Sequence, residues 1–269
     1  MTLRLAVAVA ALGTTSMARA GVVMEMQMAP DEDDPKGATS TMYIQGNKLC
    51  VEVRGKDPKV PRHVMIFDGD SKTMTSVEPE SRSYFQMTAA EVKAMSERGR
   101  EQAKAAREKT RAALEKLPPE QRKQVEEMLK KQEEAVKPRA PLKYTFEKTG
   151  KSGKAAGHSC DWYKQFESGE YEGQGCFVPL ARLGLAVQDF KVFDAMMSYY
   201  ETSPAGGADR MDFGRLMAQA PGFPVIAAKE KDGKPRETMR FTRIAKESVP
   251  ASRFAPPDGY QRKKTPGTE

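Results

Sequence analysis

Residues 144–166, YTFEKTGKSGKAAGHSCDWYKQF, are decisive for the fold, because they could contain either a nucleotide-binding loop or a connection between two strands. The Thr-Gly-Lys-Ser at 149–152 is similar to the end of a nucleotide-binding loop. Such a loop also requires a glycine five positions before the glycine of its Gly-Lys-Ser triplet, and Thr145 stands there, inside a strand-like segment. We therefore interpret the glycine-rich centre as a connection between two strands, YTFEK and CDWYKQF, and not as a phosphate-binding loop.

A nucleophile beside a base is the second chemistry that this stretch could hold. His158 and Cys160 are two residues apart, so a strand would point both toward one face, and a thiolate–imidazole pair is conceivable. Cys176 is a competing partner, because it and Cys160 stand symmetrically about residues 168–169, as facing positions of a β-hairpin would. Exported proteins commonly join such cysteines. We predict a Cys160–Cys176 disulfide.

Few other residues of the chain could carry chemistry. Cys50 is expected to be the odd cysteine, although its pairing with either of the other two stays open. His63 and His158 are the only histidines of the sequence, too few for a zinc site or a histidine-based triad. No Gly-x-Ser-x-Gly elbow occurs. We expect no metal site, no cofactor and no enzymatic activity.

The N-terminus reads as an export signal. Residues 1–20, MTLRLAVAVAALGTTSMARA, combine an early arginine, an apolar run and a small-x-small cleavage site at 18–20, which is typical of a secretory signal peptide. The apolar run is about half of the ~20 residues that a membrane span needs. We predict cleavage before Gly21, a soluble mature chain without a membrane span, and a periplasmic or extracellular location.

Charge and length limit the classes of partner. The net charge of +7 includes Arg4 and Arg19 of the signal peptide, so the mature chain carries +5. This modest excess argues against nucleic-acid binding, while a loose attraction to anionic lipid or polysaccharide stays open. The mature length suits one β-rich domain, residues 21–269, with an insertion.

The mature N-terminus shows the clearest strand pattern. In GVVMEMQM, residues 21–28, Val22, Met24, Met26 and Met28 alternate with other residues, and this period of two marks a strand with one buried face. Further strand-like segments follow up to residue 87, linked by short turns. Strands joined by tight turns are antiparallel neighbours.

Methionine is the unusual feature of the composition. The chain has 16 methionines, and eight lie on strand-like segments. These are Met24, Met26, Met28, Met42, Met65, Met74, Met87 and Met239. Methionine is pliable and polarizable, so such residues can fill a core or line a cavity for an apolar ligand. Under the second hypothesis the ligand-lining residues are Met26, Met28, Met42, Ile44 and Phe241.

Residues 88–137 differ from the rest in composition. They are rich in strong helix formers and are interrupted by Leu-Pro-Pro-Glu at 117–120, which predicts a helical hairpin. Its first helix carries small residues at helical spacing, among them Gly99, Ala103 and Ala106, which indicates a narrow seam between the helices. The hairpin could be a partner-grasping or chaperone-like arm, or a solvated insertion. Further on we expect helices over 185–201 and 209–219 and a hairpin turning at Asp232-Gly233.

Five short segments, in order, carry a family resemblance: YIQGNK, FDGDSKTM, AGHSCDWY, GFPV and SRFAPPDGY. In this order they resemble a family of exported bacterial proteins known only as a domain of unknown function. That family is similar in strand plan to the periplasmic lipoprotein carriers LolA and LolB. The resemblance covers most of residues 21–262. It implies an α+β fold with a curved antiparallel sheet, an unclosed half-barrel, and helices on its concave side.

The resemblance also shapes the expected function. In the carriers the hollow of the sheet receives acyl chains. The helical hairpin and the expected disulfide depart from the carriers' plan. We expect a non-enzymatic periplasmic or secreted protein that binds an apolar ligand such as a lipid, an acyl chain or a lipoprotein-like partner. The alternative is an envelope interaction module that acts through residues 88–137.

Overall fold

The fold is built on one large curved sheet. The computed structural model describes residues 20–30, 36–57, 62–114, 118–135, 142–201, 213–231 and 234–265. Twelve strands form a single sheet in the order β12-β6-β5-β4-β3-β2-β1-β11-β10-β9-β8-β7. The strands are β1 Ala20–Met28, β2 Ala38–Gln45, β3 Lys48–Gly55, β4 His63–Asp68, β5 Thr73–Glu78, β6 Ser83–Thr88, β7 Tyr144–Ala155, β8 His158–Glu167, β9 Glu170–Val178, β10 Phe223–Lys231, β11 Lys234–Ser248 and β12 Gln261–Arg262.

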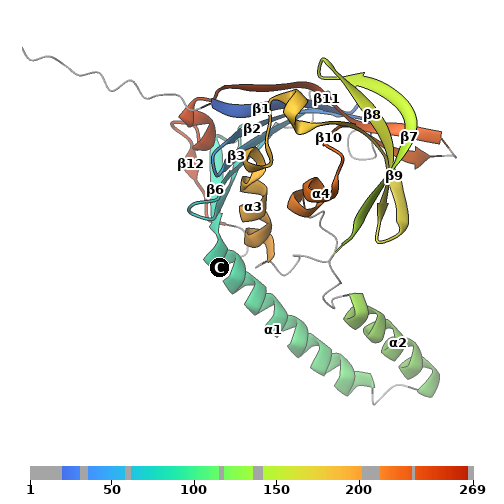
Figure 1. The fold of residues 1–269 in the computed structure, drawn as a ribbon. Helices are drawn as coiled ribbons and strands as arrows, with labels where there is room; N and C mark the ends of the chain where they lie inside the picture. Colours follow the sequence, from blue (N-terminus) through green and yellow to red (C-terminus); the bar gives the residue numbers. More distant parts are fainter. Residues whose placement is uncertain are drawn as a thin grey trace, which may run out of the picture.

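The helices lie in two groups. One group of α-helices lies beneath the arch of the sheet, and the other projects from it (Figure 1). The projecting pair is α1 Ala89–Leu114 and α2 Pro119–Ala135. The group under the sheet is α3 Val192–Glu201 and α4 Phe213–Gln219. Three short 3-10 helices complete the described elements: η1 Leu180–Leu183, η2 Val187–Phe190 and η3 Ala251–Phe254.

The strand pairing confirms the coarse fold prediction. Strands β1 to β6 and β7 to β11 form two meanders, joined where β1 pairs with β11 in antiparallel fashion. The short β12 pairs with β6 in parallel and is the exception among the described pairs. The molecule is therefore an α+β fold with a large, unclosed and predominantly antiparallel sheet.

The core lies between the concave face of the sheet and α3. Strand residues that point to this face at one end of the sheet are fully buried, among them Ile44, Leu49 and Phe67. The ring of Phe67 lies 5.6 Å from the ring of Tyr199 on α3, and the Tyr199 hydroxyl donates to the Met87 carbonyl at 3.1 Å. Burial raises the pKa of Tyr199. The helix is thus fixed to the sheet by ring packing and one hydrogen bond.

The convex face has a smaller apolar cluster under the C-terminal segment. Its buried members are Cys50, Val64, Ile66 and Val77, with Phe254 and Tyr260 packed against them. Arg253 fastens the covering segment. It donates from Nη1 to Glu52 Oε1 at 2.7 Å and lies 4.9 Å over the Tyr43 ring. The tail from η3 to β12 is therefore part of the structure of the sheet.

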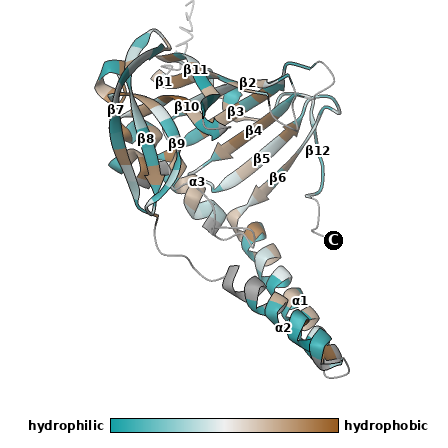
Figure 2. Ribbon diagram, turned by 90° about the vertical axis from the view of Figure 1, so that its right-hand side faces the viewer, coloured by the Kyte–Doolittle hydropathy of each residue, from teal (hydrophilic) through white to brown (hydrophobic). Residues whose placement is uncertain are grey.

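The helical hairpin forms as predicted, but the small residues Gly99, Ala103 and Ala106 do not form a buried seam. Of the predicted seam residues, Gly99 is partly exposed and Ala103 and Ala106 are exposed. Burial in α1 is concentrated at its base, at Val92 and Ser96, and at its last residue, Leu114. Small side chains bury too little apolar area to hold two charged helices together along their length. Hydrophilic residues cover much of both helices (Figure 2).

The decisive stretch folds as a hairpin, with its turn displaced from the glycine-rich centre. Strand β7 continues through the Gly-Lys-Ser segment to Ala155, with a bulge between Lys148 and Ser152, and the turn is at Ala156-Gly157. Gly157 has φ +80°, a left-handed conformation that glycine adopts without strain. The expected signal peptide and the Asp232-Gly233 turn lie outside the described residues, except for Ala20 at the start of β1.

Candidate functional site

All eight strand methionines share the concave face of the sheet. Directly opposed residues of neighbouring strands point to the same face. Three methionine pairs are directly opposed: Met24 with Met42, Met28 with Met239, and Met74 with Met87. Met65 shares this face because Val51 lies directly opposite both Met42 and Met65. Met26 shares it because it is two residues from Met24 on β1. We call these eight residues the methionine face.

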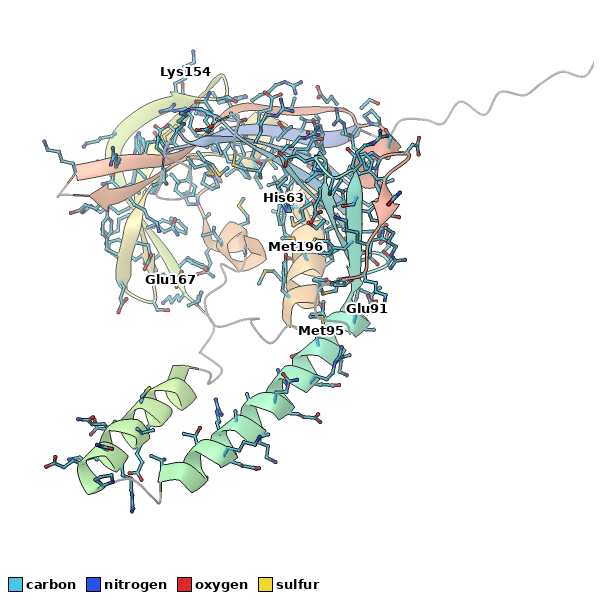
Figure 3. The ribbon with its side chains drawn as sticks, turned by 180° about the vertical axis from the view of Figure 1, so that it is seen from behind. His63, Glu91, Met95, Lys154, Glu167 and Met196 are labelled. Carbon is cyan, nitrogen blue, oxygen red and sulfur yellow. A yellow bond between two sulfur atoms is a disulfide. The ribbon has the colours of Figure 1, made fainter. Side chains whose placement is uncertain are left out.

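Among the described residues, burial of the methionine face is greatest at one end. At the end that contacts η2 and α3, Val22, Met24 and Phe67 are buried. Toward the opposite end, Met26, Met28 and Met239 are partly exposed. In total seven of the eight methionines keep part of their surface in contact with solvent; Met24, 1% exposed, does not. Met196 of α3 lies beneath the arch (Figure 3).

The five hypothesised lining residues lie on this one face but divide into two groups. Ile44 and Phe241 are 1% and 4% exposed and belong to the core, and the Phe241 ring packs against Phe223 at 5.1 Å. Met26, Met28 and Met42 are the partly exposed group. Only these three could contact a ligand without a rearrangement of the core.

Sequence reasoning missed one polar residue on the same face. Ser40 lies directly opposite Met26 and Val53, is 3% exposed, and its Oγ has no hydrogen-bond partner. A buried hydroxyl without a partner costs about 1–3 kcal/mol. Its position two residues before Met42 in an alternating strand is the signal that could have placed it on this face.

The predicted disulfide is present. Cys160 and Cys176 are bonded, with their Cα atoms 5.4 Å apart. They are not directly opposed: the register, which includes a bulge between Gln165 and Phe166, places Trp162 opposite Cys176. Cys160 is therefore held in a bond and offers no thiolate to His158. The third cysteine, Cys50, is free and buried.

The bridge is packed against a glycine. A Cβ at Gly153 would lie 2.9 Å from Trp162 Nε1 and 3.1 Å from the Cys176 sulfur. Both distances are too short for a side chain without displacement of the indole or the bridge. Gly153 is thus explained by close packing against the disulfide, and not by phosphate binding.

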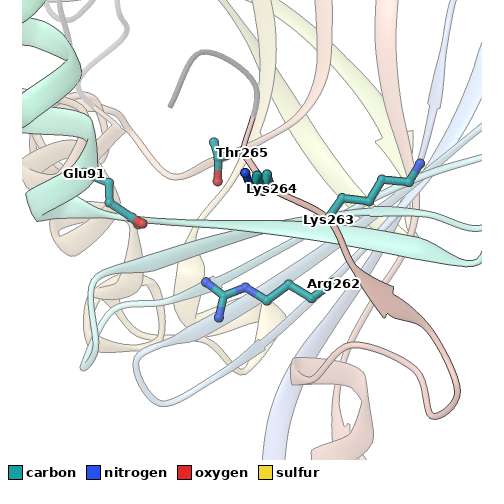
Figure 4. A pocket seen from close by; sticks show the side chains of 5 residues that line it. All are labelled: Glu91, Arg262, Lys263, Lys264 and Thr265. Carbon is teal, nitrogen blue, oxygen red and sulfur yellow. The ribbon is translucent and has the colours of Figure 1, made fainter. Parts of the chain in front are cut away.

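A polar cavity of about 330 Å³ lies outside the methionine face. It is lined by Glu91 of α1 and by Arg262, Lys263, Lys264 and Thr265 of the C-terminal segment (Figure 4). Glu91 Oε2 accepts hydrogen bonds from the Thr88 backbone N–H at 2.7 Å and hydroxyl at 2.8 Å. These bonds lower the pKa of Glu91, and Arg262 adds to the effect. The carboxylate in the cavity is thus already engaged in capping α1.

Cys50 lines a smaller cavity of about 100 Å³ under the C-terminal segment. Burial, reinforced by the negative charge of Glu52, raises the pKa of Cys50 to about 12. A thiol with so high a pKa is a poor nucleophile and a poor metal ligand near neutral pH. Among the described residues no group of three or more His, Cys, Asp and Glu side chains could hold a metal ion.

The comparisons with known proteins place the chain in a family. Residues 105–260 match the model of a family described as a domain of unknown function, DUF4412. The match covers more than half of the sequence, and the chain belongs to this family. The matched region begins within α1 and leaves out β1 to β6, although β1 pairs with β11 in the same sheet. No curated protein matches the sequence.

Within the described residues, no helix has both the length and the apolar character that a membrane crossing requires.

Proposed function

We propose that the protein binds an apolar ligand, such as a lipid or another molecule with an acyl chain, against the methionine face. The observation that carries this proposal is the gathering of all eight strand methionines on one face, seven of them partly exposed. Strands favour β-branched and aromatic residues, so a core alone does not require methionine there. Flexible thioether side chains can adapt to chains of different shape.

The binding energy would come from burial of hydrocarbon. Each methylene removed from water contributes about 0.8 kcal/mol, so one acyl chain could bind without a polar recognition code. This mode is similar to that of the LolA and LolB carriers, whose strand plan the sequence resembles. A disulfide between Cys160 and Cys176 supports an exported, periplasmic or extracellular protein.

The first test is direct detection of the ligand. Protein purified from its native compartment is extracted with organic solvent, and the extract is analysed by mass spectrometry. Stoichiometric lipid supports the proposal. Protein that carries no lipid and also fails to bind a fluorescent fatty acid in solution contradicts it.

Paired variants locate the binding face. Met42→Gln places an amide on the methionine face and is expected to weaken fatty-acid binding at least about fivefold, because the amide must be desolvated. Thr39→Gln makes a comparable change at an exposed position of the opposite face of β2 and is expected to leave binding unchanged. Equal effects of the two variants would argue against the methionine face.

An envelope interaction module remains a second candidate, favoured by the exposure of the hairpin. Every described side chain from Arg100 to Arg111 is exposed, and Met128 of α2 is 54% exposed. Under this proposal a protein partner would be captured through residues 88–137. Loss of capture when the hairpin is removed, with fatty-acid binding absent in both proteins, would favour this candidate.

A further inference from the structure

We propose that the partly exposed end of the methionine face is a binding site for a soft monovalent metal ion, Cu(I) or its analogue Ag(I). The ligands are the thioether sulfurs of Met26, Met28 and Met239. This site goes beyond apolar-ligand binding, and each can be present without the other.

The register brings the three residues together. Met28 and Met239 are directly opposed across β1 and β11, which corresponds to Cα atoms about 4.5–5.5 Å apart. Met26 is next on the same face of β1, about 7 Å along the strand, and diagonal to Met239. A methionine side chain has three rotatable bonds, so sulfur atoms from these positions can converge on one ion.

Accessibility and chemistry support the same three residues. All three are partly exposed, so an ion could reach them from solvent without opening the core. Thioethers are soft, uncharged ligands, and soft ligands select Cu(I) over hard cations. Their neutrality matters, because a +1 ion held by three thioethers needs no deprotonation of the protein and leaves no buried carboxylate.

Apolar character alone does not account for this choice of residue. Leucine, isoleucine and valine would supply the same burial with equal or better strand propensity. On β2, Ser40 and Ala38 lie directly opposite Met26 and Met28, and Met42, diagonal to Met26, adds a further sulfur nearby. Thioethers are therefore concentrated at this end of the face, although other residues lie among them.

The decisive experiment replaces sulfur and keeps the apolar surface. The full chain is titrated with Cu(I) in the presence of ascorbate and a chromophoric Cu(I) chelator. All proteins carry Cys50→Ala, which removes the one free thiol. Met26→Leu/Met28→Leu/Met239→Leu is expected to weaken Cu(I) binding at least about tenfold, since leucine has no donor atom. The matched control, Met128→Leu, removes an exposed methionine of α2 and is expected to bind like the parent.

A second measurement does not depend on the variants. Ag(I) is added to protein labelled at the methionine methyl groups, and the shifts are followed by NMR. Selective shifts of Met26, Met28 and Met239 support the site. Absence of Cu(I) binding by the parent, unchanged binding by the triple variant, or Ag(I) shifts spread evenly over exposed methionines such as Met128 would each overturn it.

Fatty-acid binding by the triple leucine variant is measured in parallel, so failure of the metal site is separable from failure of the apolar-ligand proposal.

Discussion

At the scale of single residues, two buried polar side chains on opposite faces of the sheet differ in their hydrogen bonding. Thr75, buried on the convex side, accepts a hydrogen bond from the Gln86 amide at 3.2 Å. Ser40, equally buried on the methionine face, has no partner. The cost of an unmade hydrogen bond exceeds the net gain from one that is made. Ser40 is therefore a local destabilisation on the methionine face that Thr75, with its hydrogen bond, does not cause on the convex face.

Ser40→Ala tests this contrast. Removal of the partnerless hydroxyl is expected to leave the free energy of unfolding unchanged or to raise it by up to about 1 kcal/mol. The comparison variant, Thr75→Val, keeps the shape and loses the acceptor, so it is expected to destabilise by about 1 kcal/mol. Urea denaturation followed by circular dichroism measures both. A loss in Ser40→Ala as large as that in Thr75→Val would show that the serine hydroxyl is satisfied.

The Cys50 thiol should react only slowly with alkylating reagents in the folded protein. Its pKa is raised to about 12 by burial, and the thiolate is the reactive form. At pH 8 we expect alkylation by iodoacetamide to be at least about 100-fold slower in the native protein than in urea. Mass spectrometry of timed samples gives both rates, and Cys160 and Cys176, as a disulfide, serve as internal negatives. Rapid native alkylation would contradict the buried position.

At the scale of elements, the boundary between β6 and α1 depends on one capping box. Thr88 Oγ1 accepts from the Glu91 backbone N–H at 3.2 Å, while the Glu91 carboxylate accepts from the Thr88 backbone N–H. This reciprocal arrangement satisfies donors that a helix start leaves without partners. It fixes the point at which the chain leaves the sheet for the hairpin.

The capping box gives stability a pH dependence. Because the folded-state pKa of Glu91 lies below its ordinary value of 4.5, its contribution is complete above that value and is lost as the pH falls through the lowered pKa. Glu91→Gln is therefore expected to be less stable than the parent at pH 7, and the difference should shrink toward zero below about pH 4. Thermal melts across this range measure it. Glu97→Gln, at an exposed ion pair with Lys93, is the control and should show little change at any pH.

At the scale of the whole molecule, the sequence predicts individual strands and the disulfide better than it predicts bulges and the register between strands. Alternation in residues 21–28 indicated the strand and its apolar face, and the symmetric cysteines indicated the disulfide, because both signals are local. The bulges at Lys148 and Gln165 were not predictable, since they depend on how neighbouring strands twist in the assembled sheet. The gathering of methionines from β1, β2, β4, β5, β6 and β11 on one face likewise follows from register between strands, which no single segment reveals.

The hairpin is the part of the molecule that the sheet should tolerate losing. Beyond Ser96 the described side chains of α1 are partly or fully exposed up to Arg111, so this segment contributes little apolar burial to the core. A variant in which residues 100–135 are replaced by a flexible Gly/Ser linker is expected to keep the unfolding free energy within about 1 kcal/mol of the parent, because lengthening or shortening a flexible loop changes its closure entropy only slowly. A second variant that also removes Val92 and Ser96, both buried, is expected to lose more than about 2 kcal/mol. Urea denaturation with the Trp162 fluorescence as readout compares the two. Equal destabilisation by both truncations would mean that the projecting helices stabilise the sheet, and the hairpin would then have to be regarded as part of the scaffold that holds the methionine face.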